Sequence, residues 1–110
     1  MIEKKNFTSP DETMTPAENV KVEVVTVGGL TLQRITAQPG WKWSKDLKPI
    51  MKTESCQKDH RIYIISGKGH VHMDDGKEDD FGPGDIVAIP PNHDGWTVGN
   101  EPVVWLELPH

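Results

Sequence analysis

Short hydrophobic runs, each closed by a turn rich in Gly, Pro or Asp, are the feature that most limits the fold of this chain. Residues 20–27 alternate apolar and polar side chains, the pair Gly28-Gly29 follows, and residues 30–37 alternate again. Two such runs joined by a glycine pair predict an antiparallel β-hairpin. Nowhere do apolar residues recur at helical spacing over a long window. The sequence therefore predicts an all-β protein of about nine or ten short antiparallel strands, forming a sandwich or barrel.

The chain is expected to form one domain. Its 110 residues fit a single core, and 35% of them are apolar, which is enough for a fold without disulfides or a structural metal. Residues 1–19 carry Pro10, Pro16 and many polar side chains without a hydrophobic period. We therefore expect a flexible N-terminal arm over residues 1–19 and a β domain over residues 20–110.

Charge and cysteine content limit the partners. The formal net charge is -5 and no run of Lys or Arg forms a basic stripe, so nucleic acid is not an expected partner. No apolar stretch has the length of a signal peptide core or a membrane span, so we expect no membrane association and a cytoplasmic location. The single cysteine, Cys56, agrees with a reducing compartment.

Three segments resemble the motifs of the cupin family. Pro39-Gly40 resembles the opening of the first cupin motif, and residues 63–69 (YIISGKG) resemble the end of its strand. Residues 82–91 (GPGDIVAIPP) are similar to the second motif, with its turn and its proline end in the right order. The resemblance covers residues 20–108 and implies a small single-domain cupin, which is a double-stranded β-helix or jelly-roll barrel.

The metal-binding positions implied by this resemblance carry different residues here. The two His positions of the first motif fall on Glu54 and Cys56, and its Glu position falls on His60. The His position of the second motif falls on Gly95, but His93 lies two residues earlier and shares its face in an extended strand. Glu54, Cys56, His60 and His93 are therefore the candidate ligands of a divalent metal ion. A mixture of carboxylate, thiolate and imidazole favours zinc.

Two other roles for Cys56 stay open. A neighbouring imidazole from His60 would lower the pKa of the thiol and make it a nucleophile, with Glu54 or Asp94 orienting the ring. Alternatively, Cys56 is an inert side chain buried in the core, which is the commonest fate of a lone cysteine.

His70 and His72 form a second His-x-His pattern, and they alternate with Val71 and Met73. Successive side chains of a strand point to opposite faces, and the apolar face packs on the core. We therefore expect Val71 and Met73 inside the barrel and the two histidines outside it.

Four tryptophans are many for a chain of this length, and most should belong to the core. Trp96 follows a polar turn at the expected barrel mouth, where it would wall a pocket for an aromatic or sugar-like ligand. Trp43 and Tyr63 are included in the same predicted pocket, although packing is the simpler role for Tyr63.

Three functions stay open. The first is a cupin barrel that binds a divalent metal ion, with zinc favoured, a small-molecule ligand or both, and acts as an enzyme through the metal. The second is a non-catalytic ligand-sensing or accessory cupin without metal. The third is a purely structural barrel whose interior is filled by side chains. The same fold hosts all of these, so the sequence leaves open whether the protein is an enzyme. We also expect a homodimer, because small cupins commonly pair and the hairpin over residues 20–37 would otherwise expose an edge rich in Val and Leu.

Overall fold

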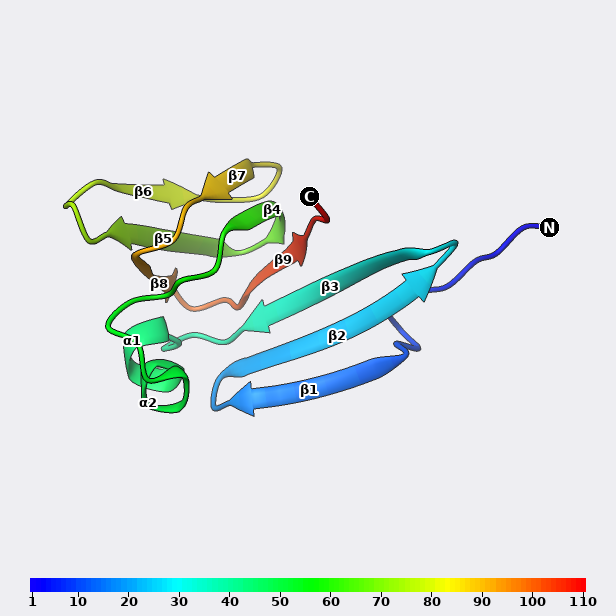
Figure 1. Ribbon diagram of the computed structural model, residues 1–110, viewed down its shortest axis with the longest axis horizontal. Coiled ribbons are helices and arrows are strands. Elements are labelled where there is room, and N and C mark those ends of the chain that lie inside the picture. The colour runs from blue at the N-terminus through cyan, green and yellow to red at the C-terminus, as the bar shows by residue number, and fades with distance from the viewer.

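The computed structural model describes residues 1–110 and is built mainly of antiparallel strands (Figure 1). The strands are β1 (Glu12–Ala17), β2 (Val20–Val27), β3 (Leu30–Ala37), β4 (His60–Ser66), β5 (Lys68–Met73), β6 (Glu78–Phe81), β7 (Ile86–Ile89), β8 (His93–Val98) and β9 (Val103–Glu107). The predicted all-β fold class is therefore confirmed.

The strands form two sheets. One has six strands in the order β1-β2-β3-β9-β4-β7, and the other has three strands in the order β6-β5-β8. Figure 1 shows the three-stranded sheet lying beside the β4 and β9 end of the larger sheet, while β1, β2 and β3 extend away from it. Because β4 and β8 belong to different sheets, side chains at the starts of these two strands can meet between the sheets.

The hairpin predicted at the glycine pair is present. β2 and β3 pair without a register shift from Val20 opposite Ala37 to Val27 opposite Leu30. Gly28 and Gly29 have φ values of 57° and 77°, which is the left-handed conformation that a two-residue hairpin turn requires.

β1 is a correction to the predicted organisation, because it lies inside the expected arm over residues 1–19. Its residues are almost all exposed, so its sequence shows no hydrophobic period. A strand at the edge of a sheet can pair through its backbone without burying an apolar face. Pro16 sits where the register with β2 shifts, and edge strands and bulges are the places that tolerate proline. β1 also covers the free edge of β2, so the edge on which the homodimer expectation rested does not exist. The homodimer itself stays a prediction.

Two single-turn helices, α1 (Trp43–Asp46) and α2 (Lys48–Met51), lie between β3 and β4. Trp43, one of the predicted pocket residues, begins α1. Helices of four residues are too short to leave a helical period in the sequence, so pattern reasoning misses them.

No helix of the protein has the length and apolar character needed to cross a membrane.

The core lies between the two sheets. Ile64 and Val103 are almost completely buried, and Trp41, Trp43 and Trp105 pack into the same cluster. Val71 is buried in this core, and Met73 packs against it, as the alternation of β5 predicted. The core therefore extends up to the first residues of β4 and β8, which are the polar residues described next.

Candidate functional site

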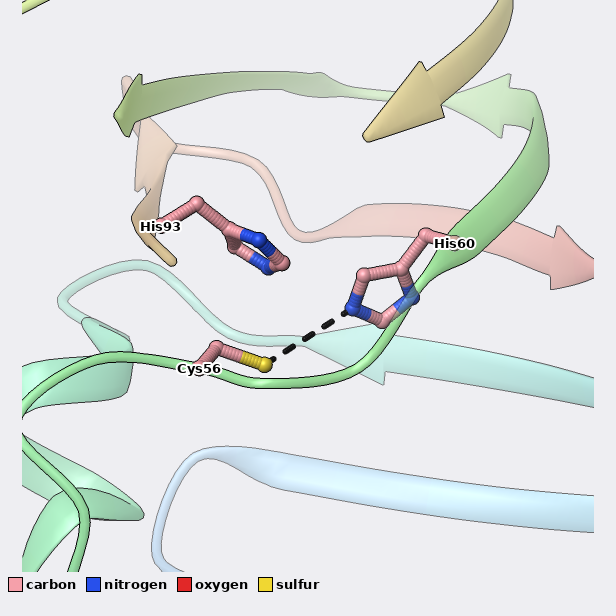
Figure 2. A group of neighbouring side chains, drawn as sticks. All are labelled: Cys56, His60 and His93. Atoms are coloured by element: carbon pink, nitrogen blue, oxygen red, sulfur yellow. Dashed lines mark hydrogen bonds between the residues drawn. The ribbon is translucent and has the colours of Figure 1, made fainter. Parts of the chain in front are cut away.

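Cys56, His60 and His93 come together between the two sheets. Cys56 lies in the segment before β4, His60 begins β4, and His93 begins β8. One ligand-competent atom from each residue lies within 4.8 Å of the other two (Figure 2). The Cys56 Sγ atom is 3.9 Å from His60 Nε2, and the two imidazole rings have centroids 5.1 Å apart.

The backbone fixes the position of Cys56 relative to His93. The Cys56 N–H donates to the His93 carbonyl at 2.7 Å, and the Asn92 N–H donates to the Cys56 carbonyl at 2.8 Å. Asn92 has a φ of 76°, and asparagine tolerates this left-handed conformation better than most residues. Asn92 therefore forms the turn without a glycine, and His93 follows directly from it.

Each histidine is held through its Nδ1 atom. The His60 Nδ1–H donates to Glu107, with 2.9 Å to Oε1 and 3.0 Å to Oε2, and the His93 Nδ1–H donates to the Pro90 carbonyl at 2.7 Å. A carbonyl oxygen only accepts, so the proton of neutral His93 lies on Nδ1. The Nε2 atoms of both rings are then the atoms left to face Cys56.

Glu107 is itself fixed by further contacts. The Trp105 Nε1–H donates to its Oε2 atom at 2.6 Å, and Lys58 Nζ lies 3.6 Å from Oε1. The side chain is only 10% exposed. Burial alone would raise the pKa of this carboxyl, but the hydrogen bond and charge of His60 and the Trp105 hydrogen bond together lower it. Glu107 is therefore a carboxylate that stabilises positive charge on His60.

Electrostatics make Cys56 and His60 a charged pair. Burial raises the pKa of the Cys56 thiol, but hydrogen bonds from His60, His93 and the Lys58 backbone outweigh it and lower the pKa to about 6. Burial lowers the pKa of His60, but its bonds to Cys56 and Glu107 outweigh it and raise the pKa to about 9. Near neutral pH the pair is thus a thiolate and an imidazolium.

An apolar cavity of about 230 Å³ opens beside these residues. Of its 23 lining residues 15 are hydrophobic, with Cys56 counted among them, and His60, His93 and Glu107 are among the polar ones. Apolar walls exclude water and strengthen electrostatic interactions inside the cavity. The arrangement therefore offers a small molecule an apolar compartment with one reactive polar end.

Of the four predicted metal ligands, the structure brings Cys56, His60 and His93 together but not Glu54. The Glu54 side chain is 96% exposed and pairs with Lys48 at 3.2 Å. The prediction of Glu54 as a metal ligand is not supported, because residues 53–55 bend instead of forming a strand that would align Glu54 with Cys56. The shared site is therefore a set of three side chains.

Of the three predicted pocket residues, Trp43 and Trp96 border the cavity and Tyr63 does not. Tyr63 lies opposite Ile86 across β4 and β7 and is 38% exposed, on the face of β4 opposite buried Ile62 and Ile64. The alternation of β4 places Tyr63 outside. The Trp96 ring stacks on His70 at 4.7 Å, so Trp96 gives only part of its surface to the cavity.

Glu107 was missed by sequence reasoning. Glu107 is the last residue of the last strand, and a polar residue at the end of a strand is common. The sequence separation between Glu107 and His60 does not indicate that they are in contact. The signal that the sequence does hold is the alternation of Trp105 and Glu107, which puts both side chains on the face that His60 shares.

Comparisons with known proteins support the same fold. Residues 57–109 match the family model described as a cupin domain. The polyketide cyclase RemF from Streptomyces resistomycificus is 17% identical, with a TM-score of 0.66 over 96% of this chain and 77% of that chain. A DUF1255 protein of unknown function from Acidithiobacillus ferrooxidans is 18% identical, with a TM-score of 0.66 over 88% of this chain and 85% of that chain.

KdgF from Halomonas sp. is 16% identical, with a TM-score of 0.59 over 90% of this chain and 88% of that chain. No curated protein sequence matches the chain significantly. The two antiparallel sheets, the strand order and these matches define a double-stranded β-helix. Residues 57–109 match a cupin domain and the neighbours share the fold, and this confirms the resemblance found in the sequence.

Proposed function

We propose that Cys56, His60 and His93 bind one divalent metal ion, with zinc favoured, and that the adjoining cavity binds a small molecule next to it. The observation that carries the proposal is the way the two histidines are held. Both Nδ1 atoms are used in hydrogen bonds to Glu107 and Pro90, so Nε2 is the nitrogen of each ring left free to bind a metal in the cluster with Cys56. This is how metal-ligating histidines are usually held.

The chemistry of the donors fits zinc. One thiolate and two imidazoles suit a borderline-soft cation, and zinc sites with Cys and His ligands are common. The low pKa of Cys56 supplies the thiolate near neutral pH, and zinc binding would displace one proton from His60 Nε2, because a ligating imidazole must be neutral. Three protein donors leave further coordination free for a ligand, as in catalytic zinc sites. A bound zinc ion would act as a Lewis acid toward an oxygen atom of a molecule in the cavity.

The residues of the chain have separate roles in this proposal. Glu107 accepts a hydrogen bond from His60 Nδ1–H and keeps that ring oriented. Trp105 and Lys58 hold Glu107 in turn. The apolar wall keeps water from competing with the bound molecule. The functional group that the bound molecule places at the polar end decides whether the protein transforms that molecule or only senses it.

Calorimetric titration of metal-free protein with zinc tests the proposal. We expect one zinc per chain, and a loss of affinity of at least about tenfold in each of Cys56→Ser, His60→Ala and His93→Ala. Glu54→Gln and His72→Ala are matched controls, because both side chains are exposed outside the cluster and should leave the affinity unchanged. Equal zinc affinity in wild type and His60→Ala would contradict the proposal.

A second function is favoured by one specific observation. Cys56, His60 and Glu107 are joined in a line, with 3.9 Å from Sγ to Nε2 and 2.9 Å from Nδ1 to Oε1. A thiolate, an imidazolium and an orienting carboxylate in this order form the arrangement of a cysteine nucleophile. In that case zinc would not protect Cys56 from iodoacetamide, whereas a zinc-ligating thiolate would be protected. Alkylation rates with and without zinc separate the two functions.

A further inference from the structure

One polar side chain of the cavity wall is not used by the fold. The polar and charged residues of the wall are Gln33, Lys58, His60, His70, His93 and Glu107. All of them except Gln33 make a side-chain hydrogen bond or ion pair to another group of the protein. Polar groups inside a protein usually have such a partner. The unpaired amide of Gln33 is therefore available to a molecule in the cavity.

The Gln33 amide also remains accessible. Gln33 is half-buried, and Trp41 Nε1 is the one fully buried side-chain polar atom without a partner, so the Gln33 amide keeps accessible surface. Side chains two residues apart on a strand share a face. On this face of β3 they change from buried Ile35 through Gln33 to exposed Thr31. Gln33 therefore lies at the mouth of the cavity, where the core gives way to solvent.

Gln33 lies beside the polar end of the cavity. It is the register partner of Glu107 across β3 and β9, and residues paired in this way have Cβ atoms about 4.5–5.5 Å apart. Glu107 in turn bonds His60 at 2.9 Å. The nearby ammonium of Lys58 already lies 3.6 Å from Glu107, and an uncharged amide does not compensate a charge. A ligand group that meets Gln33 is therefore an uncharged one.

We propose that Gln33 is a ligand-binding residue and that the molecule in the cavity is a small aromatic acid with an uncharged hydroxyl group. The hydroxyl bonds the Gln33 amide, which both donates and accepts. The acidic group lies at the Cys56, His60 and His93 cluster, and this part rests on the proposed metal function. The aromatic body fits a wall that includes all four tryptophans. A volume of about 230 Å³ suits one ring, because drug-sized ligands occupy larger pockets.

Pairs of benzoates of nearly equal size test the Gln33 contact. 3-Hydroxybenzoate is compared with 3-methylbenzoate, and 4-hydroxybenzoate with 4-methylbenzoate, because a methyl group replaces the hydroxyl without its hydrogen bonds. Calorimetry measures binding to zinc-treated protein, with the zinc content of each sample determined. In at least one pair we expect wild type to bind the hydroxyl compound about five- to tenfold more tightly, which is the effect of one hydrogen bond.

Gln33→Leu removes the amide and should lose this preference. It should bind the methyl compound at least as tightly as wild type does, because no amide is then left unpaired. The free energy of unfolding in urea should not fall in Gln33→Leu, and a fall would contradict the premise that the fold leaves the amide unused. Gln38→Leu replaces an exposed glutamine outside the cavity, so this matched control should keep the wild-type preference.

Equal affinity of wild type for both members of both pairs would overturn the contact, and so would an undiminished preference in Gln33→Leu. The wild-type comparison needs no variant, so it holds even where Gln33→Leu folds poorly. The same pairs are measured on metal-free protein, because the hydroxyl contact does not involve the metal. A preference for the hydroxyl compound in protein that takes up no zinc would mean that the metal function has failed and the Gln33 contact has not. Absence of benzoate binding in both forms would overturn the proposed ligand class.

Discussion

The imidazole of His60 and the carboxylate of Glu107 are joined across neighbouring strands β4 and β9, with 2.9 Å between Nδ1 and Oε1. Both side chains are largely buried, at 15% and 10% exposure. A carboxylate on Nδ1 raises the basicity of a histidine and sets which nitrogen faces a metal. Glu107 therefore orients the His60 ring and stabilises positive charge on it.

Glu107→Gln is expected to weaken zinc binding by about tenfold. This is the smaller of the losses in metal affinity that follow when a residue hydrogen-bonded to a metal ligand is replaced. The amide keeps an acceptor for His60 Nδ1 but removes the negative charge. The pKa of His60 should fall for the same reason, and NMR titration of the imidazole measures it. Glu101→Gln, at an exposed turn, is the control. Unchanged zinc affinity in Glu107→Gln would mean that Glu107 has no role in the site.

The pH dependence of thiol alkylation follows from the lowered pKa of Cys56. In metal-free protein the alkylation rate should rise through a midpoint near pH 6 and level off above it, because the thiolate is the reactive form. His60→Ala removes the largest stabilising hydrogen bond, so its midpoint should move up toward the ordinary thiol range. Iodoacetamide rates from about pH 5 to about pH 10.5 cover both midpoints. A wild-type midpoint in the ordinary thiol range would contradict the charged pair.

Much of the fold could be predicted from the sequence because its signals are local. The glycine pair at Gly28 and Gly29 marks the β2–β3 hairpin, and the alternation around Val71 marks the inner face of β5. β1 escaped prediction because an exposed edge strand has no apolar face. Tyr63 was misplaced because a run of aliphatic residues does not show which face of β4 is buried.

The site was only partly predictable because its residues meet through tertiary structure. Cys56 and His60 were found at motif positions, and His93 was found two residues before one, whereas Glu54 failed because its segment is bent. Glu107 had no local signal at all, since it reaches His60 only when β9 pairs with β4.

Gly67 is expected to tolerate no side chain. It has a φ of 75°, and a Cβ atom there would meet the backbone of Pro102 and lie 2.7 Å from the Val103 Cα. Gly67→Ala should lower the free energy of unfolding by about 3 kcal/mol, from backbone strain of about 1 kcal/mol plus overpacking. Gly99→Ala isolates the strain alone, because Gly99 has a φ of 86° and open space around it. Equal destabilisation by both, measured by urea unfolding, would rule out the clash.

Removal of residues 1–19 is expected to lower stability and to expose the edge of β2. β1 pairs with β2 from Glu12 opposite Val24 to Ala17 opposite Val20, and unpaired edges invite association between copies. The shorter deletion of residues 1–5 leaves β1 intact and is the control. Sedimentation and urea unfolding of both proteins measure the effect. Equal stability and association of the two proteins would show that β1 contributes nothing.

X-ray absorption at the zinc edge tests the central claim most directly, because it reports the donor atoms around bound zinc. For the zinc-loaded protein we predict one sulfur at about 2.3 Å and nitrogens at about 2.0–2.1 Å, with the sulfur shell lost in Cys56→Ser. A first shell of only nitrogen and oxygen in the wild-type protein would contradict the assignment of Cys56, His60 and His93 as the metal site.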